Sequence, residues 1–291
     1  MNFQGEVLDY VASIYEDPIG FDCFIEPDLP VYMRIDPLKL FIDVDYLVKH
    51  SEYFVPNDYQ KRKLDAAHKI GYSLITVWED DWRDRKNIVK KMLKHKLGLS
   101  DAPRIFARKT EVDLEVTTKE AKDFCELNHI QGFTRAKVKT GLRDSKGNLV
   151  ALSMWAIYPA KKEAVLVRYC TSKDVVGGFS KILKHTEVLL KDLDVKTLVT
   201  FADYSVSTGL LYEKTGWVVD KLLNPDYSYI VDMMRVHKFN YRLKRFKTDP
   251  ELYWEEGLTE KQLAEVNNLL RVYDYGKIRY VKHIDNYEDN R

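Results

Sequence analysis

Hydrophobic and polar positions follow two periods along this chain, one typical of helices and one typical of strands. Hydrophobic residues recur at helical spacing in six segments: residues 5–15, 58–69, 84–97, 118–128, 178–190 and 207–214. Strand-like alternation or a short hydrophobic run marks nine more: residues 38–45, 72–78, 104–108, 139–142, 148–157, 164–170, 198–202, 217–219 and 227–231. We expect the last two of these to complete one sheet of a C-terminal domain. The pattern therefore predicts a mixed α/β protein.

A turn-like segment divides this pattern into two parts. Ser100, Asp101, Ala102 and Pro103 follow the glycine that ends the helix predicted at residues 84–97, and a new strand begins after them. We predict an N-terminal domain of residues 1–100 and a C-terminal domain of residues 104–291, which includes a basic segment near its end.

Composition narrows the class of protein. Of the 291 residues, 45% are hydrophobic, which is enough apolar side chain for packed cores. No run approaches the roughly 20 apolar residues of a membrane span, and residues 1–17 lack the order of a signal peptide, so we expect a cytoplasmic protein without a membrane partner. Three widely separated cysteines predict free thiols and no structural zinc.

Charge gives no overall attraction to nucleic acid, because 46 Lys and Arg face 45 Asp and Glu. Residues 83–96 and 235–247 are nevertheless locally basic, and the second segment also carries aromatic residues. Clustered cations neutralise phosphates, so both segments are predicted to contact double-stranded DNA, with solvated helix faces as the alternative. The candidate contacts are Lys86, Lys90, Lys91, Lys94, Lys238, Arg242, Lys244 and Arg245.

Acidic residues at the end of a predicted strand form the first candidate site. Asp43 and Asp45 lie two residues apart, so both side chains point to one face of the strand and together can hold Mg²⁺ or Mn²⁺. His50 follows as a candidate acid or base, and Lys63 on the next helix as a candidate for stabilising charge on a phosphate. Glu79 offers a further oxygen ligand, although an exposed acidic turn explains the same pattern.

These residues fall in the order of a known family. Glu6, the segment 42–45, His50, Lys63 and the segment 71–82 resemble the phage homing endonucleases called Hef-like, and the likeness spans most of residues 6–280. The first domain of that family is similar to very-short-patch-repair endonuclease, a branch of the PD-(D/E)XK fold. The resemblance implies a catalytic site made of the helix glutamate Glu6, the strand acids Asp43 and Asp45, the histidine His50, the lysine Lys63 and the acid Glu79.

One departure from the family opens an alternative. Where the family carries Leu-Asp-Ile before the acidic strand, this chain has Leu29, Pro30 and Val31, so an important metal-binding aspartate is missing. The sequence therefore leaves a second hypothesis open: a nuclease that has lost its activity but still binds DNA.

The C-terminal domain carries a second candidate site. Segments 175–181 and 211–217 resemble the same phage family and also a GNAT-type acyltransferase, in which glycines open a helix that receives the pyrophosphate of acyl-CoA. The resemblance assigns the phosphate loop to Gly177, Gly178, Ser180 and Lys181, and a general acid to Tyr212. The alternative is that a turn requires the two glycines and that Tyr212 is packed in the hydrophobic core. The basic residue that starts such a loop is absent here, so we expect no measurable affinity for acetyl-CoA.

The leading hypothesis is a metal-dependent DNA endonuclease of the homing type, followed by a GNAT-like domain that positions DNA. The alternatives are an acyl-CoA-dependent acyltransferase and the inactive, DNA-binding nuclease. The hypothesis requires Glu6, Asp43, Asp45, His50 and Lys63 to converge in one cleft, because metal ligands lie within a few ångströms of one point.

Overall fold

The computed structural model describes residues 2–204 and 209–284, which form two compact units. Unit 1 consists of Met1–Val89, Asp203–Val206 and Leu223–Lys277, and unit 2 consists of Lys90–Ala202, Ser207–Leu222 and Ile278–Arg291. The sequence pattern placed one division near residues 100–104. In the structure the chain first leaves unit 1 at Val89, inside a helix, and the whole basic segment of residues 235–247 belongs to unit 1.

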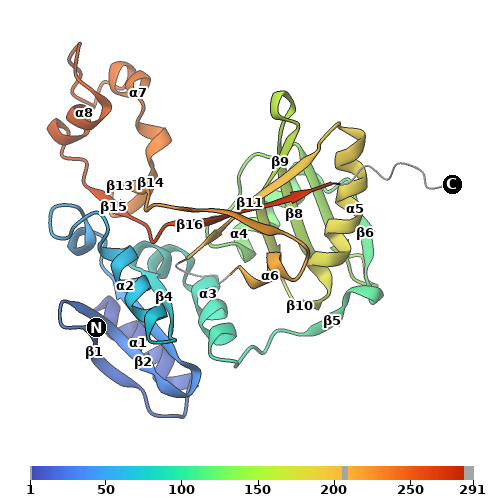
Figure 1. Cartoon of the computed structure of the whole chain (residues 1–291), viewed down its shortest axis with the longest axis horizontal. Helices are drawn as coiled ribbons and strands as arrows, with labels where there is room; N and C mark the ends of the chain where they lie inside the picture. Colours follow the sequence, from blue (N-terminus) through green and yellow to red (C-terminus); the bar gives the residue numbers. More distant parts are fainter. Residues whose placement is uncertain (1, 205–208, 285–291) are drawn as a thin grey trace. The chain divides into compact units, whose positions relative to one another are not determined.

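Unit 1 begins with a four-stranded sheet in the order β1-β2-β3-β4 (Figure 1). Its strands are β1 (Gly20–Glu26), β2 (Leu29–Ile35), β3 (Leu40–Asp45) and β4 (Ser73–Trp78), and its helices are α1 (Phe3–Ile14), α2 (Tyr59–Lys69) and the first part of α3 (Glu79–Lys96). Strands β1, β2 and β3 are antiparallel, whereas β3 and β4 are parallel. All six residues of β3 are buried, as expected for an inner strand with a parallel neighbour.

The second part of unit 1 is a small sheet with two short helices. Strands β13 (Tyr227–Val231), β14 (Met234–His237) and β15 (Arg271–Tyr273) pair in the order β14-β13-β15, and helices α7 (Leu243–Thr248) and α8 (Glu260–Val266) follow β14. Phe246 from α7 and Leu263 from α8 pack with Tyr229 and Tyr241 in its core. The expectation that residues 227–231 complete a C-terminal-domain sheet is therefore wrong.

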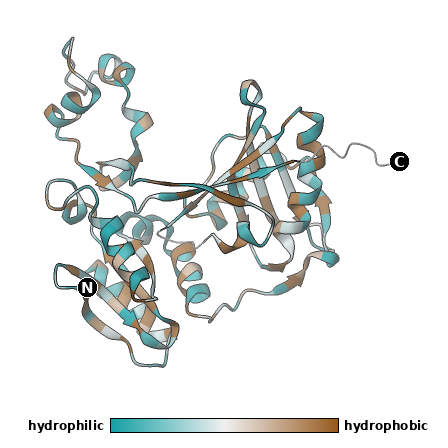
Figure 2. Ribbon diagram, in the orientation of Figure 1, coloured by the Kyte–Doolittle hydropathy of each residue, from teal (hydrophilic) through white to brown (hydrophobic). Residues whose placement is uncertain are grey.

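Unit 2 is built on a seven-stranded sheet in the order β12-β16-β11-β9-β8-β7-β6. The strands are β6 (Glu111–Asp113), β7 (Val138–Arg143), β8 (Leu149–Tyr158), β9 (Glu163–Thr171), β11 (Thr197–Asp203), β12 (Val218–Leu223) and β16 (Lys277–His283). Strands β5 (Arg104–Phe106) and β10 (Asp174–Val176) form a separate parallel pair. Figure 2 shows hydrophobic residues along much of this sheet and hydrophilic residues in the loops.

The helices of unit 2 are α4 (Thr118–Asn128), α5 (Gly178–Asp192) and the short α6 (Leu210–Glu213). Helix α4 is capped by Thr117, whose hydroxyl accepts a hydrogen bond from the backbone amide of Glu120. Helix α5 buries a row that includes Thr186, whose hydroxyl hydrogen-bonds Thr140 of β7 at 2.7 Å. This hydrogen bond therefore ties the middle of α5 to β7.

The predicted mixed α/β fold is confirmed, and most predicted elements agree with the structure within a few residues. The helix predicted at residues 207–214 begins outside the described residues and contains α6. Among the residues that the structure describes, no helix combines the length and apolar character that crossing a membrane requires.

Candidate functional site

The two strand aspartates of unit 1 lie in a buried polar cluster. Asp43 and Asp45 project to the same side of β3, as predicted, and both are almost fully buried. The Lys63 ammonium, from α2, contacts the Asp43 carboxylate directly. Asp45 accepts a hydrogen bond of 2.9 Å from the side-chain amide of Gln60, and Nε2 of His50 lies 3.2 Å from its other oxygen. The structure thus brings together four of the residues that the sequence proposed.

Burial dominates the electrostatics of this cluster. It raises the pKa of Asp43, and the nearby Asp45 raises it further, while Lys63 opposes both effects. Burial alone would lower the pKa of Lys63, but attraction to Asp43 and Asp45 outweighs burial and raises it. The ammonium of Lys63 therefore stays charged at neutral pH and compensates the acidic pair.

His50 does not complete the hydrogen bonding of Asp45. Its Nδ1 lies 3.1 Å from the carbonyl oxygen of Tyr46, so a neutral ring donates there and leaves Nε2 without a proton to give. The distance of 3.2 Å from Nε2 to Asp45 Oδ1 agrees with an ion pair only for a protonated ring, and Asp45 Oδ1 has no hydrogen-bond donor within the described protein.

The remaining predicted members of this site are engaged elsewhere. The Glu6 carboxylate accepts hydrogen bonds from Nε1 of Trp82 at 3.0 Å and from the Lys86 ammonium at 2.7 Å. A Glu79 oxygen lies 3.3 Å from the backbone amide of Leu47. Over residues 2–204 and 209–284, no three His, Cys, Asp or Glu side chains are placed to hold a metal ion. The predicted binding of Mg²⁺ or Mn²⁺ by Asp43 and Asp45 is corrected accordingly, because Lys63 already neutralises Asp43.

Sequence reasoning missed three members of the cluster. Gln60 lies three residues before Lys63 on α2, a spacing that places both on one helix face and could have revealed it. The hydroxyl of Tyr275 lies 2.6 Å from that of Thr76 on β4, and burial raises the pKa of Tyr275 well above its usual value. No local signal links Tyr275 to residues 199 positions earlier.

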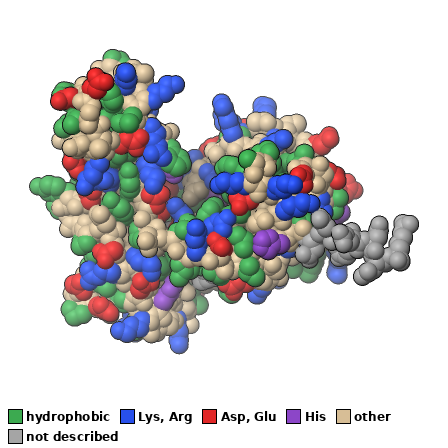
Figure 3. All heavy atoms as spheres, turned by 45° about the horizontal axis from the view of Figure 1, so that its top comes forward, with side chains coloured by type: hydrophobic (Ala, Val, Ile, Leu, Met, Phe, Trp, Pro, Cys, Tyr) green, Lys and Arg blue, Asp and Glu red, His purple; other side chains and the backbone are tan. Residues whose placement is uncertain are grey.

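The basic residues proposed for DNA contact lie in two places. Lys86, Lys90, Lys91 and Lys94 are on α3, where Lys86 is paired with Glu6 and Lys94 with Asp101. Those of the later segment are in unit 1: Lys238 pairs with Asp226, Arg242 with Glu260 and Arg245 with Asp249, and Lys244 lies on α7. Lys and Arg are interspersed with Asp and Glu on the face drawn in Figure 3.

In unit 2, the predicted phosphate loop lies at the start of α5. Gly177 is the residue before the helix and has a φ of 75°, a left-handed conformation that glycine adopts without strain. Gly177 has no side chain that could cap the helix, so within the described residues the first amide groups of α5 are left to other partners. Ser180 is exposed in the first turn, whereas the Lys181 ammonium contacts the carbonyl oxygens of Ala107 and Thr110.

Strand β9, which precedes β10 and this loop, separates from its neighbour β11. β9 and the parallel β11 pair over three positions, the last of them Val165 with Val199. A shift in the register of β9 with β8 then leaves Val167 as an extra residue, and such a bulge bends and twists a strand. In the described sheet, residues 167–171 keep β8 as their strand neighbour, and no strand pairs with their other edge.

Tyr212 of α6 lies in an aromatic cluster of unit 2. Its ring centroid is 5.8 Å from those of Phe179 and Trp217 and 5.3 Å from that of Tyr280. Burial raises the pKa of Tyr212, and a hydrogen bond with Thr200 opposes that shift. The hydroxyl is therefore protonated at neutral pH.

No protein-family model matches the chain, and a search of curated proteins finds no match. Solved acetyltransferases are similar to part of it. Ribosomal-protein-S18-alanine N-acetyltransferase from Escherichia coli is 13% identical, with a TM-score of 0.37 over 62% of this chain and 98% of that one. A Bacillus subtilis acetyltransferase in complex with CoA is 12% identical, with a TM-score of 0.37 over 60% and 99%. A GNAT family acetyltransferase from Elizabethkingia anophelis with acetyl-CoA bound is 12% identical, with a TM-score of 0.36 over 60% and 98%.

These comparisons contradict the predicted metal-dependent homing endonuclease, because the similar structures that we compared are acetyltransferases. None of them supports a PD-(D/E)XK fold for residues 1–100. The expectation that acetyl-CoA does not bind is corrected as well: several of the similar structures hold CoA or acetyl-CoA. That expectation relied on a missing basic side chain, although the backbone amides of a helix start bind phosphate without one.

Proposed function

We propose that unit 2 is an acyltransferase that takes its acyl group from an acyl-CoA thioester. The observation that carries the proposal is the separation of β9 from β11 at Val167, on the sheet strand that precedes β10 and the start of α5. Within the described residues, β9 thus presents an open edge, and the first amides of α5, which follows β9 after the short β10, have no side-chain cap from Gly177.

These two features fit two parts of CoA. The pantetheine arm carries two secondary amides, and an extended amide chain can pair with an open strand edge as an added strand does. The pyrophosphate suits the first turn of α5, where backbone N–H groups and the helix dipole favour negative charge. Lys181 and Lys173 are held by Ala107 and Asp144, so the proposal gives phosphate binding to the backbone and not to these cations.

Tyr212 supplies the proton that the reaction needs. The amine or hydroxyl nucleophile bonds to the acyl carbon of the bound thioester and releases its proton to water, while the carbon–sulfur bond breaks and the sulfur departs as a thiolate. Because burial raises the pKa of Tyr212, the phenol holds its proton until a stronger base is formed beside it. We assign Tyr212 the role of general acid toward the leaving sulfur.

Titration calorimetry with acetyl-CoA tests the proposal on the full chain, with Ser180→Asp and Ser180→Asn as a matched pair. Ser180 is exposed in the first turn of α5, where a carboxylate stabilises the helix but repels a pyrophosphate. We expect Ser180→Asp to weaken binding by about tenfold or more, as a lost charge-assisted contact of about 1.5 kcal/mol implies. The amide of Ser180→Asn has nearly the same shape and should bind within about twofold of the unchanged protein. Absence of binding by the unchanged protein, or equal binding by both variants, would refute the proposal.

A further inference from the structure

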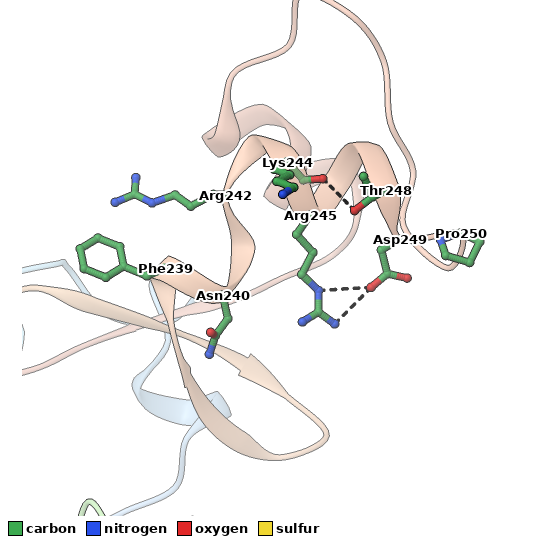
Figure 4. A pocket seen from close by; sticks show the side chains of 8 residues that line it. All are labelled: Phe239, Asn240, Arg242, Lys244, Arg245, Thr248, Asp249 and Pro250. Carbon is green, nitrogen blue, oxygen red and sulfur yellow. Dashed lines mark hydrogen bonds and ion pairs between the residues drawn. The ribbon is translucent and has the colours of Figure 1, made fainter. Parts of the chain in front are cut away.

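An open pocket of about 580 Å³ lies beside α7 in unit 1 (Figure 4). Its lining residues are Phe239, Asn240, Arg242, Lys244, Arg245, Thr248, Asp249 and Pro250. Three cationic side chains and one carboxylate are thus combined with an aromatic ring and a side-chain amide. All of them come from a stretch of twelve residues, so the local fold alone creates this combination.

An exposed aromatic ring stands at one rim of the pocket. The Phe239 side chain is 60% exposed although it is a large hydrophobic group, and the Arg242 guanidinium lies 4.4 Å from its ring centroid. Figure 4 shows these two side chains together on one side of the pocket. The His237 ring also packs against Phe239, with ring centroids 4.7 Å apart, so these two neighbours keep the ring oriented while 60% of the residue stays exposed.

Cations surround the remaining space. Arg245 is paired with Asp249 at 3.1 Å, on the opposite side of the pocket from Phe239. Arg242 is half exposed and forms an ion pair of 3.1 Å with Glu260. A guanidinium has five N–H donors, so those of Arg242 and Arg245 both keep donors for a ligand. Lys244 is exposed, and within the described part of the chain its ammonium has no ion-pair partner.

We propose that this pocket binds a single-stranded nucleic acid segment, with one base stacked on Phe239 and the flanking phosphates held by Arg242, Lys244 and Arg245. Proteins that bind single-stranded nucleic acids combine exposed aromatic rings with cations, because every base has a face that stacks and every phosphate linkage has a charge. The Asn240 side chain adds a donor and an acceptor for the edge of the stacked base. This inference concerns unit 1 and is independent of the proposed acyl transfer in unit 2.

A short oligothymidylate of about 12 nucleotides with a fluorescent label tests the proposal on the full chain by anisotropy. Phe239→Ala should weaken binding by about fivefold to a hundredfold, the range that loss of one stacked base implies. Lys244→Glu should weaken it and reduce the slope of log affinity against log salt by about 0.7 for each lost phosphate contact. Lys261→Glu is the matched control, because it makes the same charge change on α8, outside the pocket.

The pattern of losses decides the result. Losses confined to the two pocket variants, with Lys261→Glu within about twofold of the unchanged protein and with weaker binding of a duplex of equal length, support the proposal. Equal losses of oligonucleotide affinity in Lys244→Glu and Lys261→Glu would overturn the proposal, because the attraction would then depend on overall charge and not on the pocket. An unaffected Phe239→Ala variant would overturn it too, as would an acidic peptide such as polyglutamate that displaces the oligonucleotide at equal charge concentration. Thermal unfolding of each variant confirms that the fold is retained.

Discussion

A Lys63→Met variant would leave the Asp43 carboxylate without the ammonium that it contacts. The Lys63 and Asp43 side chains are 1% and 6% exposed, so solvent cannot replace the lost partner. Removing one member of a buried ion pair typically lowers the free energy of unfolding by about 3–5 kcal/mol. We expect a loss of that size near pH 8, because methionine keeps most of the volume of lysine and leaves little cavity.

The loss should depend on pH with a defined sign. Asp43 already has a raised pKa in the folded chain, and removal of Lys63 raises it further. Between the ordinary pKa of an aspartate and this raised value, the folded state binds one more proton than the unfolded state, so stability falls as the pH rises. The slope is about 1.4 kcal/mol per pH unit. The difference between variant and unchanged protein should therefore narrow as the pH is lowered from 8 to 5.

Urea unfolding at several pH values measures both effects. Lys61→Met is the matched control: it breaks the exposed pair with Asp65 four residues away and should change stability by less than about 0.5 kcal/mol. The double variant Lys63→Met with Asp43→Leu removes the stranded charge and should recover most of the loss. A Lys63→Met effect as small as that of Lys61→Met, or one that is constant with pH, would refute the account of a buried compensating pair.

Two further predictions concern unit 2. Tyr212→Phe should lower the turnover of any acyl transfer by roughly 10²-fold while leaving acetyl-CoA affinity unchanged, which steady-state kinetics and calorimetry distinguish. An equal fall in affinity would instead assign Tyr212 to binding. Gly209→Ala should destabilise the protein by about 1–3 kcal/mol in thermal unfolding, because Gly209 has a φ of +78° and the added Cβ would lie 2.0 Å from the Tyr280 hydroxyl. A variant as stable as the unchanged protein would contradict this packing.

Local periodicity predicted the elements that bury one face against a sheet. Residues 118–128 and 178–190 were recognised because their hydrophobic side chains recur at helical spacing, and both became helices that pack on the seven-stranded sheet. The hairpin of β1 and β2 was missed because Pro30 and its neighbours resemble a loop. Proline has no backbone N–H to donate to a neighbouring strand. Pro30 is tolerated because β2 pairs with β3 only from Met33 to Ile35, which lie beyond the proline.

Pairing between distant segments was not predictable in the same way. The sequence of residues 227–231 indicates a strand, but nothing local determines that it joins β14 and β15 in unit 1. For the same reason, the sequence revealed only some of the residues of the acidic cluster. Asp43, Asp45, His50 and Lys63 lie within 21 residues and have readable spacings, whereas Tyr275 reaches Thr76 across 199 positions.

The chain order of the two units sets a constraint on biosynthesis. Unit 1 contains residues before Val89 and residues up to Lys277, so the ribosome must make nearly all of unit 2 before the partners of Glu52 and Thr76 exist. At usual elongation rates this interval is roughly 10 to 40 s. During it, the first sheet waits without Arg271 and Tyr275, and its exposed apolar surface is open to chaperones or to aggregation. A gene fragment that stops before residue 223 would therefore yield unit 1 in a permanently unfinished state.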